Sequence, residues 1–346
     1  MKKVVIGMSG GVDSSVAAIL LKKQGYEVIG VTFIFTDDFN TKDSEDVCKK
    51  LNIKHYIKDY RNEFKEKIIE KFISDYKLGL TPNPCVLCNK TVKIKYLFDM
   101  MKQLDADYIA TGHYARIIDR KLYKSENLSK DQSYFLAGVE KEELNHILFP
   151  LNNLSKEEVR NIARDNNLLN ANAKDSTDVC FIKTNFKEYM TNKIHNSKGP
   201  VIDIETKEQI GEHIGLMYYT IGQRKGLNIG GYENRMFVVD KDLDKNILYV
   251  ALGEDNDYLY SDCAVISDIN WISDIKPSKC SAKFRYRQPD NDVELEYLDD
   301  EIIVKYSQKI KSVTPGQACV FYLNDECLGG GIIKEVRKNN EKLSYL

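Results

Sequence analysis

Hydrophobic positions follow two different periodic patterns along the chain, and the first of them predicts a parallel sheet. Apolar runs of strand length occupy residues 3–8, 28–35 and 108–111. Segments with helical spacing of apolar residues separate them, at residues 14–24, 44–51, 61–78 and 89–104. Strands that alternate with helices are typical of an α/β fold in which helices cover both faces of a parallel sheet. Ligands of such sheets bind at the carboxyl ends of the strands.

The second half of the chain changes to a pattern typical of antiparallel strands. Residues 144–189 keep a helical pattern, in which Ser155-Lys-Glu-Glu predicts a capping box. Farther on, short apolar runs at 237–240 and 247–250 flank a turn-rich stretch and predict a hairpin. From Trp271 onward apolar and charged residues alternate, which predicts a small antiparallel β-barrel. We therefore predict three domains, at residues 1–199, 200–270 and 271–346.

Composition narrows the class of protein. Fifty Lys and Arg against 52 Asp and Glu give a net charge of −2, which excludes a globally basic nucleic-acid coat but allows a local basic patch. No apolar run approaches the roughly 18–20 residues that cross a bilayer. The apolar start of the chain breaks at Gly10 and Gly11, before a signal-peptide core could form. We predict a cytoplasmic protein without a membrane partner.

The segment Ser9-Gly-Gly-Val-Asp-Ser14 predicts a nucleotide site, because it follows a buried strand and opens a helix. Two glycines let the backbone turn tightly and present its N–H groups to a polyphosphate at the helix N-terminus. Asp13 can hold Mg²⁺, and Ser9 and Ser14 can donate hydrogen bonds to phosphate oxygens. The segment matches neither the Walker motif nor GxGxxG.

The eight cysteines are too few for a disulfide scaffold in a chain of this length. Cys85 and Cys88 form a CxxC before a predicted helix, next to Lys90 and Lys93, and this setting predicts lowered thiol pKa values. Cys180 lies alone, far along the chain. A structural zinc site remains open at this point, with Cys48 or His113 as the fourth ligand, although a second tight cysteine pair is missing from the sequence.

A basic segment offers a candidate surface for RNA. Residues 276–287 contain five Lys and Arg and no acidic residue, with Phe284 and Tyr286 between them. Basic and aromatic side chains on one strand can bind phosphates and stack on bases. The same pattern also fits an ordinary solvated strand face, and the residues alone do not choose between the two.

Twelve segments, in order and over nearly the whole chain, resemble the bacterial tRNA-specific 2-thiouridylase family. They are residues 7–14, 81–84, 87–90, 110–114, 130–135, 175–177, 180–182, 215–218, 222–226, 285–288, 314–317 and 329–333. The loop SGGVDS is similar to that of the pyrophosphate-loop (PP-loop) ATPases. The resemblance implies a PP-loop domain of the adenine-nucleotide alpha-hydrolase type with a helical tRNA-contacting extension, a β-rich central domain and a tRNA-binding C-terminal β-barrel.

The resemblance also implies an activity: ATP-dependent 2-thiolation of the wobble uridine of Lys, Glu and Gln tRNAs, with ATP and Mg²⁺ as cofactors. A cysteine desulfurase or a sulfur-relay protein would be the sulfur donor. By the same resemblance the nucleotide contacts are Gly7, Met8, Ser9, Gly10, Gly11, Val12, Asp13, Ser14, Phe33 and Gly112. The implied tRNA contacts are Asn83, Pro84, Cys85, His113, Lys130, Asp131, Gln132, Arg285, Tyr286 and Gln317. Phe33 replaces the Met that is more usual there.

Two mechanisms follow from the resemblance and from one departure. In the family scheme Cys180 carries sulfur as a persulfide, and Cys88 attacks it to leave a Cys88–Cys180 disulfide. The family usually has Asp at the position of Cys85, and the extra thiol gives the alternative of a [4Fe-4S] cluster on Cys85, Cys88 and Cys180. Two other classes stay open: another PP-loop synthetase acting on a small acid, and a non-catalytic metal-containing RNA-binding module.

Overall fold

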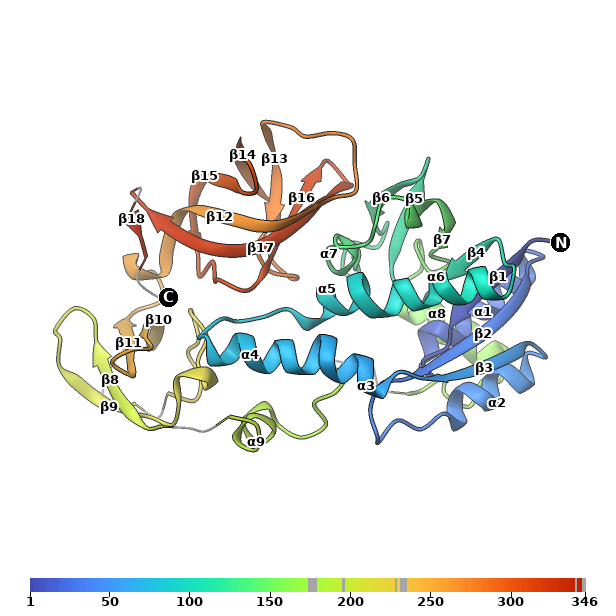
Figure 1. The fold of residues 1–346 in the computed structure, drawn as a ribbon, viewed down its shortest axis with the longest axis horizontal. Coiled ribbons are helices and arrows are strands. Elements are labelled where there is room, and N and C mark those ends of the chain that lie inside the picture. The colour runs from blue at the N-terminus through green and yellow to red at the C-terminus, as the bar shows by residue number, and fades with distance from the viewer. Residues whose placement is uncertain (174–178, 195–196, 228, 231–234, 340, 344–346) are drawn as a thin grey trace.

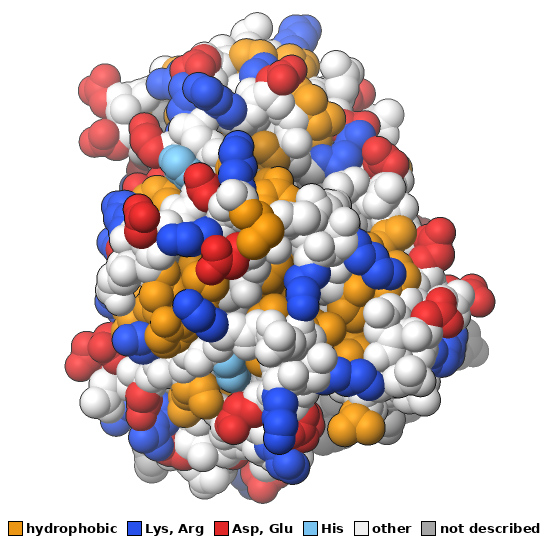
Figure 2. Space-filling view, turned by 90° about the vertical axis from the view of Figure 1, so that its right-hand side faces the viewer, with side chains coloured by type: hydrophobic (Ala, Val, Ile, Leu, Met, Phe, Trp, Pro, Cys, Tyr) orange, Lys and Arg blue, Asp and Glu red, His pale blue; other side chains and the backbone are white. Residues whose placement is uncertain are grey.

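A computed structural model describes residues 1–173, 179–194, 197–227, 229–230, 235–339 and 341–343. The parallel-sheet domain lies at one end of the molecule, and two β-rich parts lie at the other (Figure 1). Figure 2 looks onto the end formed by the parallel-sheet domain, where basic, acidic and hydrophobic side chains are interspersed and no patch of one sign stands out. Among the described residues, no helix combines the length and apolarity needed to cross a membrane.

The N-terminal domain is built on a five-stranded sheet in the order β3-β2-β1-β4-β7, with every pairing parallel, as predicted. Its strands are β1 Lys3–Gly7, β2 Glu27–Ile34, β3 Lys54–Asp59, β4 Tyr108–Ala110 and β7 Ile147–Leu148. Successive residues of β1 point to opposite faces. Val4 and Ile6 pack in one core cluster and Val5 in another, so both faces of the sheet are buried.

Helices cover the two faces of the sheet. The cluster of Val4 contains residues of α1 Val12–Lys23, α2 Lys42–Lys50 and α8 Lys156–Asp165. The cluster of Val5 contains residues of α6 Ile94–Gln103 and of the helical segment 61–77. The capping box predicted at Ser155 is confirmed, because the Ser155 Oγ accepts from the Glu158 amide at 3.2 Å and the Glu158 carboxylate accepts from the Ser155 amide at 2.7 Å.

Two of the predicted helices contain wide π-helical turns. The first consists of α3 Arg61–Phe64, η1 Lys65–Glu70 and α4 Lys71–Lys77. The second consists of α5 Pro84–Cys88, η2 Asn89–Lys93 and α6. It begins five residues before the predicted start, because Pro84 occupies the first turn and Asn83 caps it. The two segments run side by side across the middle of the molecule (Figure 1). Such π turns are frequent at functional sites.

The helical pattern predicted for residues 144–189 is only partly right. Its described part contains η3 Glu143–His146, the short strand β7, α8 and α9 Phe186–Thr191. The segment before it forms a hairpin that the sequence pattern did not predict, β5 Ala115–Ile118 and β6 Lys121–Lys124, followed by α7 Ser133–Leu136. Tyr123 of β6 pairs with Glu326 of the C-terminal barrel, so this hairpin joins the first domain to the last.

The central sheet has the strand order β10-β11-β8-β9. Its strands are β8 Gly199–Asp203, β9 Gln209–His213, β10 Met236–Asp242 and β11 Ile247–Leu252. The short helix η4 Leu216–Tyr218 follows β9, and η5 Asp257–Leu259 follows β11. Strands β10 and β11 pair antiparallel, which confirms the predicted hairpin.

The C-terminal strands close into the predicted antiparallel barrel. They are β12 Tyr260–Trp271, β13 Lys279–Lys283, β14 Asn291–Tyr297, β15 Ile302–Lys311, β16 Ala318–Leu323 and β17 Glu326–Lys338, with β18 Glu341–Lys342 beside β17. They pair in the order β12-β15-β14-β13-β16-β17, and β17 pairs again with β12. Strand β12 starts the barrel at Tyr260, before the predicted boundary at 271.

Candidate active site

The predicted nucleotide loop connects β1 to α1. Gly10 has a φ of +79°, which favours glycine, and Gly11 is the N-cap of α1 without a side-chain cap. Ser14 Oγ donates to the Gly11 carbonyl at 3.1 Å and lies 3.2 Å from Ser9 Oγ, so the two hydroxyls meet across the loop. The first amides of α1 therefore remain available to an anion at the carboxyl edge of the sheet.

Gly112 touches this loop from the end of β4. A Cβ atom at Gly112 would lie 2.8 Å from the Ser14 amide nitrogen and 2.9 Å from the Asp13 carbonyl carbon. Real Cβ atoms do not approach backbone so closely, so only glycine fits here. The backbone at Gly112 therefore packs directly on the nucleotide loop, and that Gly112 contacts the nucleotide itself stays a prediction.

Asn170, which the sequence analysis did not single out, also holds the loop. Its side-chain Nδ2 donates to the Gly10 carbonyl at 2.7 Å and to Ser15 Oγ at 3.0 Å. Asn170 is buried, and its Oδ1 has no partner among the described residues. A lone asparagine about 160 residues from the loop gives no signal in the sequence, because only tertiary packing brings the two together.

Replacing Asn170 with alanine is expected to raise the KM for ATP about 30-fold, because two hydrogen bonds of the loop are lost at about 1 kcal/mol each. Steady-state kinetics with varied ATP would measure the effect. Asn166→Ala is the matched control, since the Asn166 side chain donates within its own helix region, to the Ile162 carbonyl. An unchanged KM in Asn170→Ala would show that the loop keeps its shape without this side chain.

Asp13, the predicted Mg²⁺ ligand, accepts from the Tyr114 hydroxyl at 2.9 Å and pairs with the Lys156 ammonium at 2.8 Å. Neither partner was predicted from the sequence. Mg²⁺ is usually held by one or two carboxylates together with phosphate oxygens and water. Asp13 fits that role as a single carboxylate, and Lys156 places a second positive charge at the same edge of the loop.

Phe33 lies at the carboxyl end of β2, as predicted, and is buried. Its ring packs against Tyr60 at 5.4 Å, Phe35 at 5.8 Å and Tyr96 at 6.2 Å between ring centroids. This aromatic cluster forms an apolar wall at the strand end. That Phe33 contacts the adenine stays a prediction.

The three predicted thiols lie in one region of the fold although Cys180 lies far along the chain. Cys88 is buried, Cys85 is half-buried and Cys180 is exposed, and all three are free. Phe181 belongs to the same core cluster as Cys88 and packs on Phe72 of α4 at 5.2 Å between ring centroids, so the segment that carries Cys180 is anchored on α4. The family motif at 175–177 lies outside the described residues.

The predicted lowering of the thiol pKa values is wrong. Burial raises the pKa of Cys88 to about 11, and Lys93 offsets only part of the effect. Burial likewise raises the pKa of Cys85, again against a smaller opposing effect of Lys93. The sequence correctly indicated a nearby cation, but the desolvation that comes from tertiary packing outweighs it. Cys180 adds to the rise in pKa of both thiols, so its sulfur lies near both.

We expect iodoacetamide at pH 7.5 to alkylate Cys180 well before Cys88. A thiol with a pKa near 11 is deprotonated in roughly 3 molecules in 10,000 at this pH, and its alkylation should quicken about tenfold per pH unit up to pH 10. Mass spectrometry of the tryptic peptides would follow each site. The buried Cys319 of the barrel is the internal reference for an inert thiol. Equal rates for Cys88 and Cys180 would contradict the burial of Cys88.

His113 links the thiols to the nucleotide loop. It follows Gly112 directly, and its Nδ1 lies 2.8 Å from Thr111 Oγ1. Burial, and secondly the charge of Lys93, lower the pKa of His113 to about 3, so the imidazole is neutral near pH 7. Lys93 thus acts on His113 as well as on Cys85 and Cys88, which places one ammonium group among all three.

Asn83, Pro84 and Cys85 lie at the start of α5, and that they surround the target uridine stays a prediction. Asn83 Oδ1 accepts from the amides of Cys85 at 3.2 Å and Val86 at 3.3 Å, so the asparagine shapes the loop that it belongs to. Pro84 is buried in the first turn.

The segment just before α5 is held by the other two domains. The Lys241 ammonium of β10 donates to the Gly79 carbonyl at 3.0 Å. The Thr81 amide donates to the Pro315 carbonyl at 3.0 Å, and Gln317 Nε2 donates to the Thr81 carbonyl at 2.7 Å. Gln317, a predicted tRNA contact, therefore takes part in a contact between domains. Its partner Thr81 lies in the segment that precedes Cys85.

Two other predicted tRNA contacts, Arg285 and Tyr286, also lie at the domain junction. Arg285 donates to the Ile221 carbonyl at 3.0 Å and to Thr314 Oγ1 at 2.8 Å, and Tyr286 packs on Phe135 at 4.2 Å between ring centroids. Lys130 lies half-buried at the turn after β6, and Gln132 Oε1 accepts from the Tyr114 amide at 3.1 Å.

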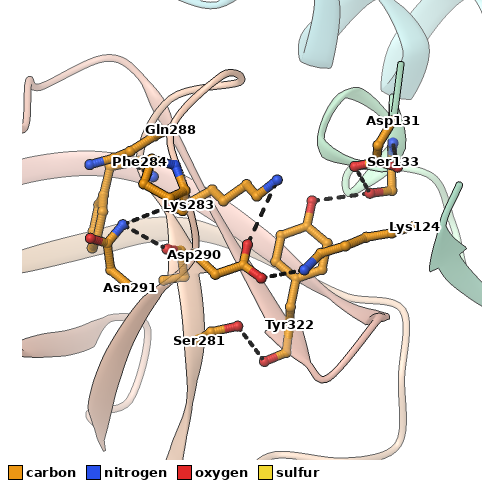
Figure 3. A network of polar contacts seen from close by, with 12 residues as sticks. Lys124, Asp131, Ser133, Ser281, Lys283, Phe284, Gln288, Asp290, Asn291 and Tyr322 are labelled. Atoms are coloured by element: carbon orange, nitrogen blue, oxygen red, sulfur yellow. Dashed lines mark hydrogen bonds and ion pairs between the residues drawn. The ribbon is translucent and has the colours of Figure 1, made fainter. Parts of the chain in front are cut away.

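Asp131 is buried at the centre of a polar network between the first domain and the barrel. Its carboxylate accepts from the Ser125 amide and from the amide and hydroxyl of Ser133. The Ser133 hydroxyl lies 3.2 Å from that of Tyr322 (Figure 3). In the same network Lys124 and Lys283 both pair with Asp290. Part of the basic segment thus neutralises an acid of its own chain.

An amide-lined glycine loop at the carboxyl edge of a parallel sheet, joined to a β-sheet domain and a β-barrel, defines the class as a PP-loop protein. Family profiles agree over most of the chain. The tRNA methyl transferase HUP domain matches residues 2–184, the tRNA methyl transferase PRC-barrel domain matches 187–252, and the aminomethyltransferase beta-barrel domain matches 261–333.

Relatives of known name extend over the full length. The tRNA-specific 2-thiouridylase MnmA of Geobacillus thermodenitrificans is 46% identical over 365 residues, covering 99% of this chain and 98% of its own. The enzyme of the same name from Mycoplasma capricolum is 45% identical over 373 residues, covering 97% and 100%. This chain therefore belongs to the tRNA-specific 2-thiouridylase family. A solved 4-thiouridine synthetase–RNA complex with bound ATP is 18% identical, with a TM-score of 0.39 over 52% of this chain and 44% of that one.

Proposed function

We propose that this chain replaces the C2 oxygen of a tRNA wobble uridine with sulfur in an ATP-dependent reaction, with the Lys, Glu and Gln tRNAs as substrates. The observation that supports the proposal is the connection between the nucleotide loop and the thiols. Gly112 touches the nucleotide loop, and its neighbour His113 shares the ammonium of Lys93 with Cys85 and Cys88. A base held between them would meet both an activated phosphate and a thiol.

The reaction needs both the nucleotide loop and the thiols, because the carbonyl oxygen of uracil is a poor leaving group. Attack of the C2 oxygen on the α-phosphate of ATP releases pyrophosphate and attaches AMP, a good leaving group. The terminal sulfur of a Cys180 persulfide then attacks C2, and AMP leaves with the oxygen. The Cys88 thiolate attacks Cys180 Sγ, which forms a Cys88–Cys180 disulfide while the electrons of the broken S–S bond pass to the sulfur on the base.

The exposures of the thiols suit these roles. Cys180 is exposed and can accept sulfur from a protein donor such as a cysteine desulfurase or a relay protein. Cys88 is buried and protonated at rest, which protects it from adventitious oxidation. Lys93 is the cation that acts on Cys88, and its charge stabilises the thiolate when the thiol loses its proton. Mg²⁺ at Asp13 would balance the charge of the leaving pyrophosphate.

A [4Fe-4S] cluster on Cys85, Cys88 and Cys180 is the alternative route for sulfur. Among the described residues, which include all three thiols, no three His, Cys, Asp or Glu side chains gather closely enough to hold a metal ion. The donor set of a cluster is therefore not assembled in this conformation, and we derive no step through one. Iron and sulfide analysis of protein purified without oxygen tests the cluster directly.

The proposed function is tested by incubating the protein with ATP, Mg²⁺, a persulfide donor and a tRNA of the Lys type. We expect AMP, pyrophosphate and 2-thiouridine in equal amounts, the last measured by mass spectrometry of nucleosides. A tRNA with cytidine at the wobble position is the matched control and should give none of the three. Pyrophosphate release without tRNA, driven by a small acid, would favour another PP-loop synthetase. No ATP cleavage under any condition would favour a binding module.

A further inference from the structure

Cys85 stands beside the proposed thiol pair and has no part in the relay described above. It shares α5 with Cys88 at a spacing of three residues, so both side chains lie on the same side of the helix. Asn83 and Pro84 fix the start of that helix, and Cys85 therefore occupies its first turn. The exposures of the thiols form a series, from exposed Cys180 through half-buried Cys85 to buried Cys88.

The disulfide left by each turnover poses a chemical problem. Once Cys88 and Cys180 are joined, no thiol is free to accept the next sulfur, and one of the two sulfurs is almost inaccessible, because Cys88 is only 8% exposed. A reductant from solution can reach only the Cys180 side. The neighbouring thiol on α5 needs no access from solution, because the helix already holds it beside Cys88 at a high effective concentration.

We infer that Cys85 is a resolving cysteine, a further catalytic residue of this chain that rests on the proposed function. The Cys85 thiolate attacks Cys88 Sγ in the Cys88–Cys180 disulfide. A Cys85–Cys88 bond forms, the Cys88–Cys180 bond breaks, and Cys180 leaves as a thiolate that takes up a proton. The exchange moves one disulfide within the chain, with no net oxidation or reduction. Cys180 is then free to accept the next sulfur.

The second half of the cycle follows from the same exposures. The Cys85–Cys88 disulfide would sit at the start of a helix with its Cys85 sulfur at the surface side. An external dithiol of the thioredoxin class can attack Cys85 Sγ, form a second disulfide within itself and return both cysteines as thiols. Sulfur loading on Cys180 and reduction at Cys85 then occur at different atoms, so the two steps need not wait for each other.

The sequence provides a direct readout of the exchange. Trypsin releases Cys85 and Cys88 together in the peptide 78–90, and Cys180 in the peptide 175–183. A Cys88–Cys180 disulfide therefore links two peptides, whereas a Cys85–Cys88 disulfide closes a ring within one. The full-length protein is loaded with persulfide, mixed with tRNA, ATP and Mg²⁺, quenched in acid with N-ethylmaleimide and digested. We expect the linked pair first, and then its replacement by the internally closed peptide.

Variants separate resolution from the thiolation step. In Cys85→Ser and Cys85→Asp the linked peptides should persist after the first turnover, and turnover at limiting dithiol should fall about tenfold. Cys280→Ser is the matched control, because Cys280 is also a free, half-buried cysteine but belongs to the barrel strand β13.

The outcomes distinguish this inference from the proposed function. Linked peptides that persist in the unaltered protein until dithiol is added would overturn the resolving role and leave the Cys88–Cys180 relay intact. An equal loss of single-turnover thiolation in both Cys85 variants would also overturn it, because Cys85 would then act in the chemical step. Formation of 2-thiouridine with no disulfide of either kind would instead overturn the persulfide relay itself.

Discussion

Gly112→Ala is expected to lower ATP-dependent pyrophosphate release about 100-fold or more. The new methyl group would lie 2.8 Å from the Ser14 amide nitrogen and 2.9 Å from the Asp13 carbonyl carbon, and both atoms belong to the backbone of the nucleotide loop. Backbone at the start of a helix cannot move aside as a flexible side chain does, so the loop itself must shift. A displacement of about 1 Å in a positioning element can cost about 100-fold in rate.

The measurement is tRNA-dependent release of pyrophosphate, together with the Tm of each variant to confirm folding. Gly211→Ala is the matched control, because among the described residues the same methyl group in β9 would meet only Ile229 and Val201 side-chain carbons, at 3.7 and 3.9 Å. We expect the control to retain full activity. A Gly112→Ala protein that releases pyrophosphate at the normal rate would show that the loop tolerates the shift, and would remove Gly112 from the nucleotide site.

The nucleotide loop could be predicted from the sequence because its signals are local. A buried strand, two glycines and a helix start occupy consecutive residues, and the turn that they form depends little on the rest of the chain. The residues that stabilise this loop could not be found in the same way. Lys156 and Asn170 reach it from more than 140 residues away, and neither stands out in its own segment.

Burial explains the other differences between prediction and structure. Strand β3 was missed because its sequence, Lys-His-Tyr-Ile-Lys-Asp, lies at the edge of the sheet and is largely exposed, so it has no apolar run. The thiol pKa values were predicted in the wrong direction because Lys93 is visible in the sequence, whereas the packing that desolvates Cys88 is not. The sequence likewise identified Arg285 as a cation but not its partners, the Ile221 carbonyl and Thr314 hydroxyl.

Gly316→Ala should disable thiolation while leaving the nucleotide loop intact. Gly316 has a φ of +89°, and a Cβ atom there would lie 2.9 Å from the Thr81 amide nitrogen and 3.0 Å from Leu80 Cβ. The barrel turn would have to withdraw from the segment that leads to Asn83 and Cys85. We expect the rate of 2-thiouridine formation to fall roughly 10- to 100-fold, because the thiol helix loses its position relative to the base. Equilibrium binding of ATP should stay unchanged.

The control for backbone strain is Gly253→Ala. Gly253 has a similar φ of +93°, but no atom of the described residues lies within 4 Å of its added methyl group. Both variants carry the cost of alanine in the left-handed region, about 1–2 kcal/mol, so both should show a lower Tm. Only Gly316→Ala should lose activity, since only there does the methyl group meet the segment before α5. Equal losses in both variants would mean that strain alone reduces activity, and that the barrel does not position the thiol helix.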